Sequence, residues 1–206
     1  MLKQRVITAA VAIPLLFLLL WLNGWWLKGL IIVLILIGLF EYWRLMQARG
    51  GRDWLWLAGP VYIILGFVAF WAVRQLGAMA WLLTVIWSTD TAAYEIGRRY
   101  GRTLLAPAVS PHKTWEGALA GLAAGCLLGM IAALITTDVG GTAALLISLL
   151  ISAVGQIGDL IESKVKRLAG VKDSGRLLPG HGGILDRFDS LLLASMFMYV
   201  LARLVL

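Results

Sequence analysis

The stretch Ile31–Phe40, which reads IIVLILIGLF, is apolar on all sides and decides the fold class. A membrane-spanning β-strand would carry a polar residue at every second position, so this run favours a helix. The whole chain has the same character, because 61% of its 206 residues are hydrophobic and only 14% are charged. Such a composition excludes an ordinary soluble domain and predicts a helical membrane protein.

Apolar runs like this one recur along the chain, and about 20 such residues are enough for one helix to cross a bilayer. We therefore predict an all-α fold, a polytopic transmembrane helical bundle of about seven spans. The expected spans are residues 6–22, 27–43, 54–73, 78–97, 116–136, 142–162 and 188–206. The start of the chain resembles a secretory signal, but no small-x-small cleavage site follows, so we interpret it as a retained first span.

The basic residues are unevenly distributed over the two sides of the predicted membrane. With a cytoplasmic N-terminus, only Lys28, Arg74 and Arg203 of the 18 Lys and Arg residues fall on the outside. This bias predicts that orientation, because Lys and Arg are retained on the cytoplasmic side during insertion. The net charge of +7 also favours contact with anionic membrane lipids. Most acidic residues lie on the inside as well, which topology does not explain, so we expect a functional site on the cytoplasmic face.

The segment 158–190 holds the densest set of polar and charged residues. Five of them share one face of the helix that ends the sixth predicted span, because they fall at i, i+3, i+4, i+7 and i+8. They are Asp159, Glu162, Ser163, Lys166 and Arg167. Glu162 and Lys166 also have the spacing of an ordinary surface ion pair. Asp159 lies inside a membrane-flanking run, where a carboxylate is costly unless paired or metal-bound, and is therefore a functional candidate.

A glycine-rich loop reads LPGHGG at residues 178–183. Its glycines give the backbone the freedom to aim neighbouring N–H groups at one anion, which is typical of phosphate sites. The role of His181 stays open between a phosphate donor and a turn residue. The candidate substrate-binding residues in and before this loop are Lys172, Asp173, His181, Gly182 and Gly183.

Three charged residues, Asp186, Arg187 and Asp189, lie at the start of the last predicted span. A helix N-terminus attracts phosphate, and the two acids there have helix capping as their alternative role. If the intervening loop doubles back, Asp159 and Asp186 would come together and hold Mg²⁺ through carboxylate oxygens. Substrate phosphates would complete the octahedral coordination.

A second set of candidates precedes the fifth predicted span. Asp90 lies one turn from Tyr94 near the end of the fourth span, and pairing with a neighbouring Arg is its alternative role. Further along, the run SPHKTWEG predicts a turn into a helix, with Thr114 and Glu116 as capping residues. A lysine beside a helix N-terminus is typical of a phosphate site. The candidates of this set are Asp90, Tyr94, Ser110 and Lys113.

These candidates supply carboxylates, cations and flexible backbone, but no activated nucleophile. The chain has no Ser-His-Asp order and no GxxxxGK[ST] loop, and its one cysteine, Cys126, lies in an apolar run. Phosphoryl transfer between two bound substrates fits this set best. A small ion-coupled transporter is the alternative of a different class, with Asp90 and Asp159 as an ion relay. That class predicts acids near mid-membrane, whereas these lie toward one face beside basic loops.

Several of these segments closely resemble the signature of bacterial phosphatidate cytidylyltransferases, also called CDP-diacylglycerol synthases. The resemblance is carried by the runs SKVKR (163–167), KDSG (172–175), PGHGGILDRFD (179–189), SPHKTWEG (110–117) and DTAAY (90–94). It extends roughly from Trp81 to the C-terminus. We therefore expect N-terminal membrane spans over residues 1–80, shortened relative to many family members, and a catalytic membrane domain over residues 81–206.

The resemblance implies a Mg²⁺-dependent reaction of CTP with phosphatidate that gives CDP-diacylglycerol and pyrophosphate, from a homodimer in the bacterial inner membrane. It implies Asp159 and Asp186 as metal ligands. The residues that it places against substrates or in the ordering of the loop are Lys113, Ser163, Lys166, Arg167, Lys172, Asp173, His181, Arg187 and Asp189. A different lipid phosphate is the nearest alternative substrate, a second cation beside Mg²⁺ is left open, and no nucleic acid partner is expected.

Overall fold

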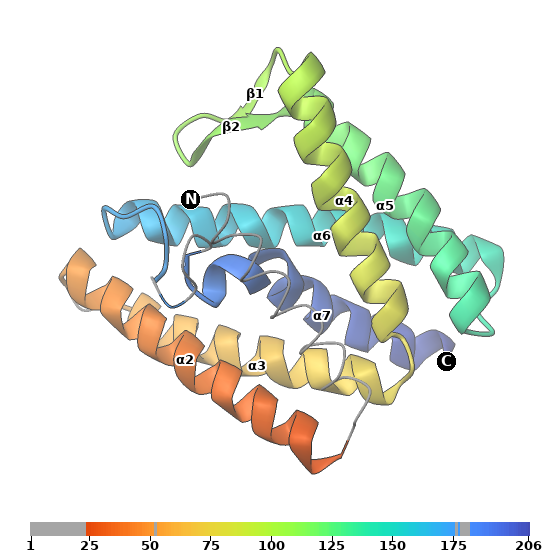
Figure 1. Ribbon diagram of the computed structural model, residues 1–206, viewed down its shortest axis with the longest axis horizontal. Coiled ribbons are helices and arrows are strands. Elements are labelled where there is room, and N and C mark those ends of the chain that lie inside the picture. Colours follow the sequence, from red (N-terminus) through yellow and green to blue (C-terminus); the bar gives the residue numbers. More distant parts are fainter. Residues whose placement is uncertain (1–23, 52, 176, 178–181) are drawn as a thin grey trace. The chain divides into compact units, whose positions relative to one another are not determined.

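The computed structural model describes residues 24–51, 53–175, 177 and 182–206. Its helices are α2 (Trp25–Arg49), α3 (Leu55–Gln75), α4 (Met79–Tyr100), α5 (Trp115–Thr136), α6 (Gly141–Leu168) and α7 (Leu185–Val205), which Figure 1 shows. Two short strands, β1 (Leu104–Ala106) and β2 (Ser110–Thr114), lie between α4 and α5 in the sequence. The predicted helical class is therefore confirmed.

Five helices of the described residues, α2, α3, α5, α6 and α7, are long and apolar enough to cross a membrane by length and composition. They correspond to five of the predicted spans and indicate a multi-pass membrane protein. The helix α4 covers the predicted span 78–97 but is not one of these five, because its second half is rich in polar and charged residues. The predicted span 6–22 lies outside the described residues, so the total of about seven spans remains a prediction.

The segment Ser110–Thr114 was predicted to be a turn. It instead forms the strand β2, which pairs antiparallel with β1. The carboxylate of Glu116 accepts hydrogen bonds from the backbone N–H groups of the two residues that precede β1, at 3.1 and 3.2 Å. The predicted cap is confirmed, since Oγ1 of Thr114 accepts a hydrogen bond from the backbone N–H of Gly117 at 3.2 Å. The fold is thus helical, with one short hairpin in addition to the helices.

The described chain forms two compact units. The first unit comprises the residues up to Val68 and the segment Val165–Phe188, and the second unit comprises Ala69–Lys164 and Asp189–Leu206. The helices α6 and α7 each contribute residues to both units. The predicted division at residue 80 concerned function rather than packing, and it remains a prediction.

In the first unit, α2 and α3 pack closely at two glycines. A Cβ at Gly38 would lie 3.2 Å from Cγ2 of Ile63, and a Cβ at Gly59 would overlap the ring of Tyr42. The Tyr42 hydroxyl donates a hydrogen bond to the backbone carbonyl of Leu55 at 2.7 Å. Because Gly59 has no side chain, the ring of Tyr42 packs directly against the α3 backbone, and the two helices approach each other at this point.

In the second unit, α5 carries a glycine at every fourth position from Gly117 to Gly129, and these glycines are buried. The helices α4 and α5 lie side by side along this row (Figure 1). A Cβ at Gly125 would overlap the hydroxyl of Thr89 on α4 and would lie 2.7 Å from the hydroxyl of Ser152 on α6. Those two hydroxyls are hydrogen-bonded to each other at 2.7 Å. The glycine row therefore brings α4, α5 and α6 close enough to position the side chains that they carry.

Candidate active site

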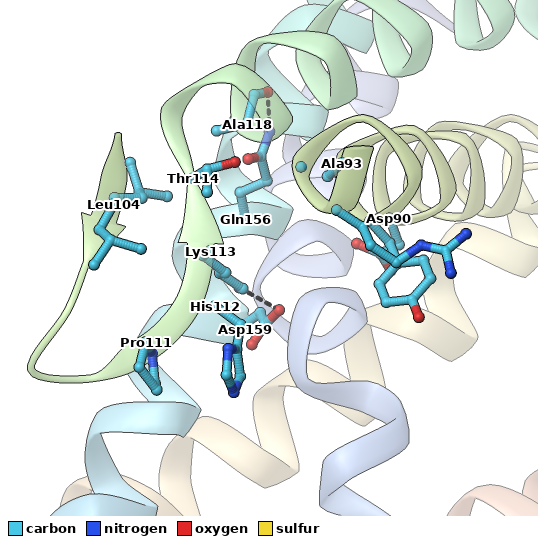
Figure 2. Close-up of a pocket in the computed structure, with 14 residues that line it drawn as sticks. Asp90, Ala93, Leu104, Pro111, His112, Lys113, Thr114, Ala118, Gln156 and Asp159 are labelled. Carbon is cyan, nitrogen blue, oxygen red and sulfur yellow. Dashed lines mark hydrogen bonds and ion pairs between the residues drawn. The ribbon is translucent and has the colours of Figure 1, made fainter. Parts of the chain in front are cut away.

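The second unit contains a cavity of about 660 Å³ that brings several predicted site residues together. Its lining includes Asp90 and Tyr94 from α4, Lys113 from β2 and Asp159 from α6. In Figure 2 the side chain of Lys113 points toward the carboxylate of Asp159, with which it forms an ion pair. Four candidates from three segments of the sequence thus share one cavity.

The Lys113–Asp159 pair is partly open to solvent, since the two side chains are 30% and 26% exposed. Oδ1 of Asp159 also lies 3.3 Å from the hydroxyl of Ser163, one turn further along α6, which donates a hydrogen bond to it. Lys113 directly precedes Thr114, the N-cap of α5, so a cation lies beside a helix N-terminus. An anionic group that enters the cavity would meet both the ammonium group and the helix N-terminus.

Asp90 is linked to α7 through Ser190. The hydroxyl of Ser190 lies 3.4 Å from Oδ2 of Asp90 and 3.1 Å from Oδ1 of Asp189. Among the described residues, the two arginines that end α4 form ion pairs with Glu95, at 3.3 and 3.0 Å, rather than with Asp90. Two candidate acids therefore share one hydroxyl group.

The first unit holds the other predicted metal ligand, Asp186. Its Oδ1 accepts a hydrogen bond from Nζ of Lys166 at 2.7 Å. Its Oδ2 accepts hydrogen bonds from the backbone N–H groups of Ser174 and Gly183, both at 2.8 Å, and from the Ser174 hydroxyl at 3.0 Å. Only 6% of this side chain is exposed. The carboxylate is charge-paired and hydrogen-bonded, as a buried carboxylate must be to persist in its charged form.

Glu41 of α2 also lies in this cluster, and the sequence analysis missed it. Its Oε1 accepts a hydrogen bond from the backbone N–H of Ile184 at 2.9 Å, and its Oε2 accepts one from the backbone N–H of Leu185 at 3.0 Å. The Ser174 hydroxyl also lies 2.9 Å from Oε2, so it can donate its proton to either carboxylate. One signal could have identified it: a carboxylate near the end of an apolar span is costly, and is therefore a functional candidate by default.

Several other candidates of the first unit lie near the same loop. Lys172 and Asp173 line a second cavity, of about 600 Å³, together with Arg44 of α2. A side-chain N–H of Arg167 donates a hydrogen bond to the backbone carbonyl of Val171 at 3.2 Å, which shapes the start of the loop. The predicted contacts of these residues with substrates remain predictions.

The remaining candidates are more dispersed. Gly182 adopts a positive φ of 82°, a conformation that favours glycine. Tyr94 is exposed, and the guanidinium of Arg98 lies 5.6 Å from its ring centre. Ser110 occupies the first position of β2, Arg187 is exposed on α7, and His181 lies outside the described residues.

The two predicted metal ligands belong to different units, so their joint role as a Mg²⁺ site remains a prediction. Among the residues that the structure describes, no group of three or more His, Cys, Asp or Glu side chains is arranged to hold a metal ion. The donor chemistry does fit Mg²⁺, because carboxylate oxygens are its preferred protein ligands and substrate phosphates commonly supply others.

The fold and these charged sites define a multi-pass helical membrane protein with lysine–aspartate pairs near the N-termini of α5 and α7. The family model described as the cytidylyltransferase family matches residues 54–205. The chain therefore belongs to the cytidylyltransferase family, as its signature runs predicted.

Two similar relatives are both named phosphatidate cytidylyltransferase. The protein of Brucella suis biovar 1 (strain 1330) is 45% identical over 158 residues, which cover 75% of this chain and 58% of the relative. The protein of Staphylococcus haemolyticus (strain JCSC1435) is 43% identical over 148 residues, which cover 70% of this chain and 55% of the relative. The chain thus spans less than two thirds of the length of the curated relatives that it matches.

Proposed function

We propose that this protein transfers a cytidylyl group from CTP to phosphatidate, forming CDP-diacylglycerol and pyrophosphate. The observation that carries the proposal is the cavity of the second unit, where Lys113 and Asp159 form a partly open ion pair beside the N-terminus of α5. This cavity lies inside the segment that matches the cytidylyltransferase family. The shared name of the relatives supports CTP and phosphatidate as the substrates.

In the proposed reaction, a phosphate oxygen of phosphatidate attacks the α-phosphorus of CTP. The bond from that phosphorus to the oxygen bridging to the β-phosphate breaks, and pyrophosphate leaves. A phosphate monoester is largely ionised at neutral pH, so the attack requires no strong general base. The ammonium group of Lys113 would stabilise the charge that builds up on the phosphate oxygens.

We further propose Mg²⁺ as the cofactor, with Asp159 and Asp186 as its protein ligands. When bound, the ion would neutralise charge on the triphosphate and assist the departure of pyrophosphate. Lys113 and Lys166 pair with these two acids, and their ammonium groups would add positive charge near the phosphate groups of a substrate. The proposal includes a homodimer in the bacterial inner membrane, with a cytoplasmic N-terminus and site.

One experiment tests the proposed function directly. Membranes that contain the full chain are incubated with labelled CTP and phosphatidate, with and without Mg²⁺, and the lipid fraction is analysed for CDP-lipid. Product that requires both substrates and the metal is the expected result. Product from another lipid phosphate alone would reassign the substrate, and no product with any lipid phosphate would overturn the enzyme assignment in favour of a transporter.

A further inference from the structure

Glu41 is only 4% exposed although it belongs to the apolar helix α2. A buried carboxylate is costly unless donors surround it. Glu41 has three of them within 3.0 Å: the backbone N–H groups of Ile184 and Leu185 and the hydroxyl of Ser174. Two of these donors are backbone groups at the start of α7, where a helix has N–H groups without partners inside the helix. Glu41 therefore acts as a helix cap that comes from a different helix.

The loop backbone is fitted closely around this carboxylate. A Cβ at Gly175 would lie 2.6 Å from Oε1 of Glu41, and a Cβ at Gly183 would lie 2.5 Å from both of its carboxylate oxygens. A side chain at either position would have to displace the carboxylate or the loop. The two glycines are thus explained by the presence of Glu41, in addition to any role in phosphate binding.

Ser174 connects Glu41 to the candidate catalytic acid Asp186. The Ser174 hydroxyl lies 2.9 Å from Oε2 of Glu41 and 3.0 Å from Oδ2 of Asp186. A hydroxyl has one proton to donate, so the two carboxylates compete for it and their positions depend on each other. Asp186 also directly follows Leu185, whose N–H is bound by Glu41. Glu41 therefore influences the orientation of Asp186 in two ways, through the Ser174 hydroxyl and through the backbone of Leu185.

We propose that Glu41 is a positioning residue, which holds Ser174 and the first residues of α7 so that the Asp186 carboxylate keeps one orientation during cytidylyl transfer. This inference rests on the proposed function. Glu41 does not contact the reacting groups; it acts through Ser174, Leu185 and Asp186. A residue that merely stabilises the fold would change the amount of folded protein and leave the turnover of each folded molecule intact.

The test compares Glu41→Gln with the wild type, with Asp53→Asn as a matched control. Asp53 also belongs to the first unit, but it is exposed and pairs with Arg49. In Glu41→Gln, the amide NH₂ group must face one of the backbone donors. Hydrogen exchange at the amide that loses its acceptor, either Ile184 or Leu185, should then become faster by about tenfold or more, as expected for the loss of a hydrogen bond to a charged group.

The second readout is the kinetics of CDP-lipid formation, normalised to folded protein. In Glu41→Gln, kcat should fall by about tenfold to a hundredfold, because small displacements of a catalytic group have effects of this size. The KM for CTP should change by less than about threefold, since a positioning residue acts on catalysis through other residues and does not bind the substrate itself. Asp53→Asn should match the wild type in both readouts.

A second variant, Ser174→Ala, keeps the inference testable if Glu41→Gln does not fold. It removes the shared hydroxyl without changing α2, and it should lower kcat in the same direction. In the double variant, the loss should be close to the larger single loss rather than the product of the two, because both changes break one linkage.

The outcomes separate the two proposals. Absence of CDP-lipid from the wild type would overturn the proposed function, while the exchange measurement would still decide whether Glu41 holds α7. Faster exchange with unchanged kcat would make Glu41 purely structural and overturn the positioning role. Unchanged exchange at Ile184 and Leu185 in a folded Glu41→Gln variant would overturn the inference outright.

Discussion

The two predicted metal-ligand acids have different surroundings. In the second unit, the contacts described for Asp159 come from the side chains of Lys113 and Ser163, and about a quarter of its side chain is exposed. In the first unit, Asp186 receives two backbone N–H groups besides Lys166 and Ser174, and 6% of its side chain is exposed. Side-chain partners can swing away, whereas backbone donors move only with their loop. Asp159 is therefore an adaptable acid, and Asp186 is a fixed one.

The largest expected effect comes from replacing the fixed acid. Asp186→Asn puts an amide NH₂ where Oδ1 meets Lys166 or where Oδ2 meets two backbone N–H groups, so at least one donor loses its acceptor. CDP-lipid formation in membranes should fall by more than about 10³-fold, as when an essential charged group is removed. Immunoblotting of the membrane fraction should show normal expression. Near-normal turnover would contradict the metal-ligand role.

Replacing the partner of the adaptable acid should have a smaller effect. Lys113→Gln removes the ammonium group from the cavity of the second unit, and turnover should fall by about 10²-fold, the typical loss for one charge-stabilising donor. Lys113→Arg serves as the control, because it keeps the charge and should recover part of the activity. Because the ion pair is partly exposed, thermal unfolding should change little. A strongly lowered unfolding temperature would show that the pair is structural.

Stability rather than turnover should respond to the glycine row of the second unit. In Gly125→Ala, the new Cβ would overlap the hydroxyl of Thr89 and crowd that of Ser152. The free energy of unfolding should decrease by about 1–3 kcal/mol, the usual range for overpacking. Gly140→Ala is the matched control, because its Cβ would meet nothing within 4 Å. Equal stabilities of the two variants would mean that the close packing of α4 and α5 does not depend on this glycine.

Much of the helical fold could be predicted, since apolar runs follow from composition alone. The predicted span 116–136 matches α5 (Trp115–Thr136) within one residue. The predicted span 142–162 ends six residues before α6 does, because the charged face from Asp159 onward continues the helix beyond the apolar run. The β1–β2 hairpin was missed, because strands of three and five residues give little periodicity and Pro111 is a typical turn signal.

The site was predictable where the chemistry is local. Thr114 was identified as a cap, because its partner lies three residues away. Glu41 could not be assigned a role in the same way, because Ser174 lies 133 residues further along the chain. A sequence shows that a buried acid is costly, but tertiary structure alone brings its donors together. Gly183 was interpreted through phosphate binding and Gly175 was given no separate role, and the contacts of both with Glu41 became visible only in the fold.

The smallest effect is expected for an acid with an exposed partner. Asp53 lies between α2 and α3, outside the membrane-spanning helices. It accepts a hydrogen bond from Arg49 at 2.9 Å, and this bond holds the pKa of the Asp53 carboxyl below its ordinary value. A lowered pKa means that the pair contributes to stability above the ordinary pKa of Asp, and that this contribution is lost as the pH falls through the lowered pKa.

At neutral pH the Asp53 pair is therefore fully formed, but water and salt screen it at the surface. Asp53→Asn should leave the unfolding temperature at pH 7 unchanged within error, and a salt titration should not distinguish it from the wild type. A clear decrease would show that the exposed Arg49–Asp53 pair stabilises the first unit. An unchanged unfolding temperature would instead show that the role of each carboxylate follows from its hydrogen-bond donors. Backbone N–H groups fix the position of Asp186, and partly buried side chains leave Asp159 able to change partners. The surface side chain of Arg49 makes little difference to the stability that Asp53 contributes.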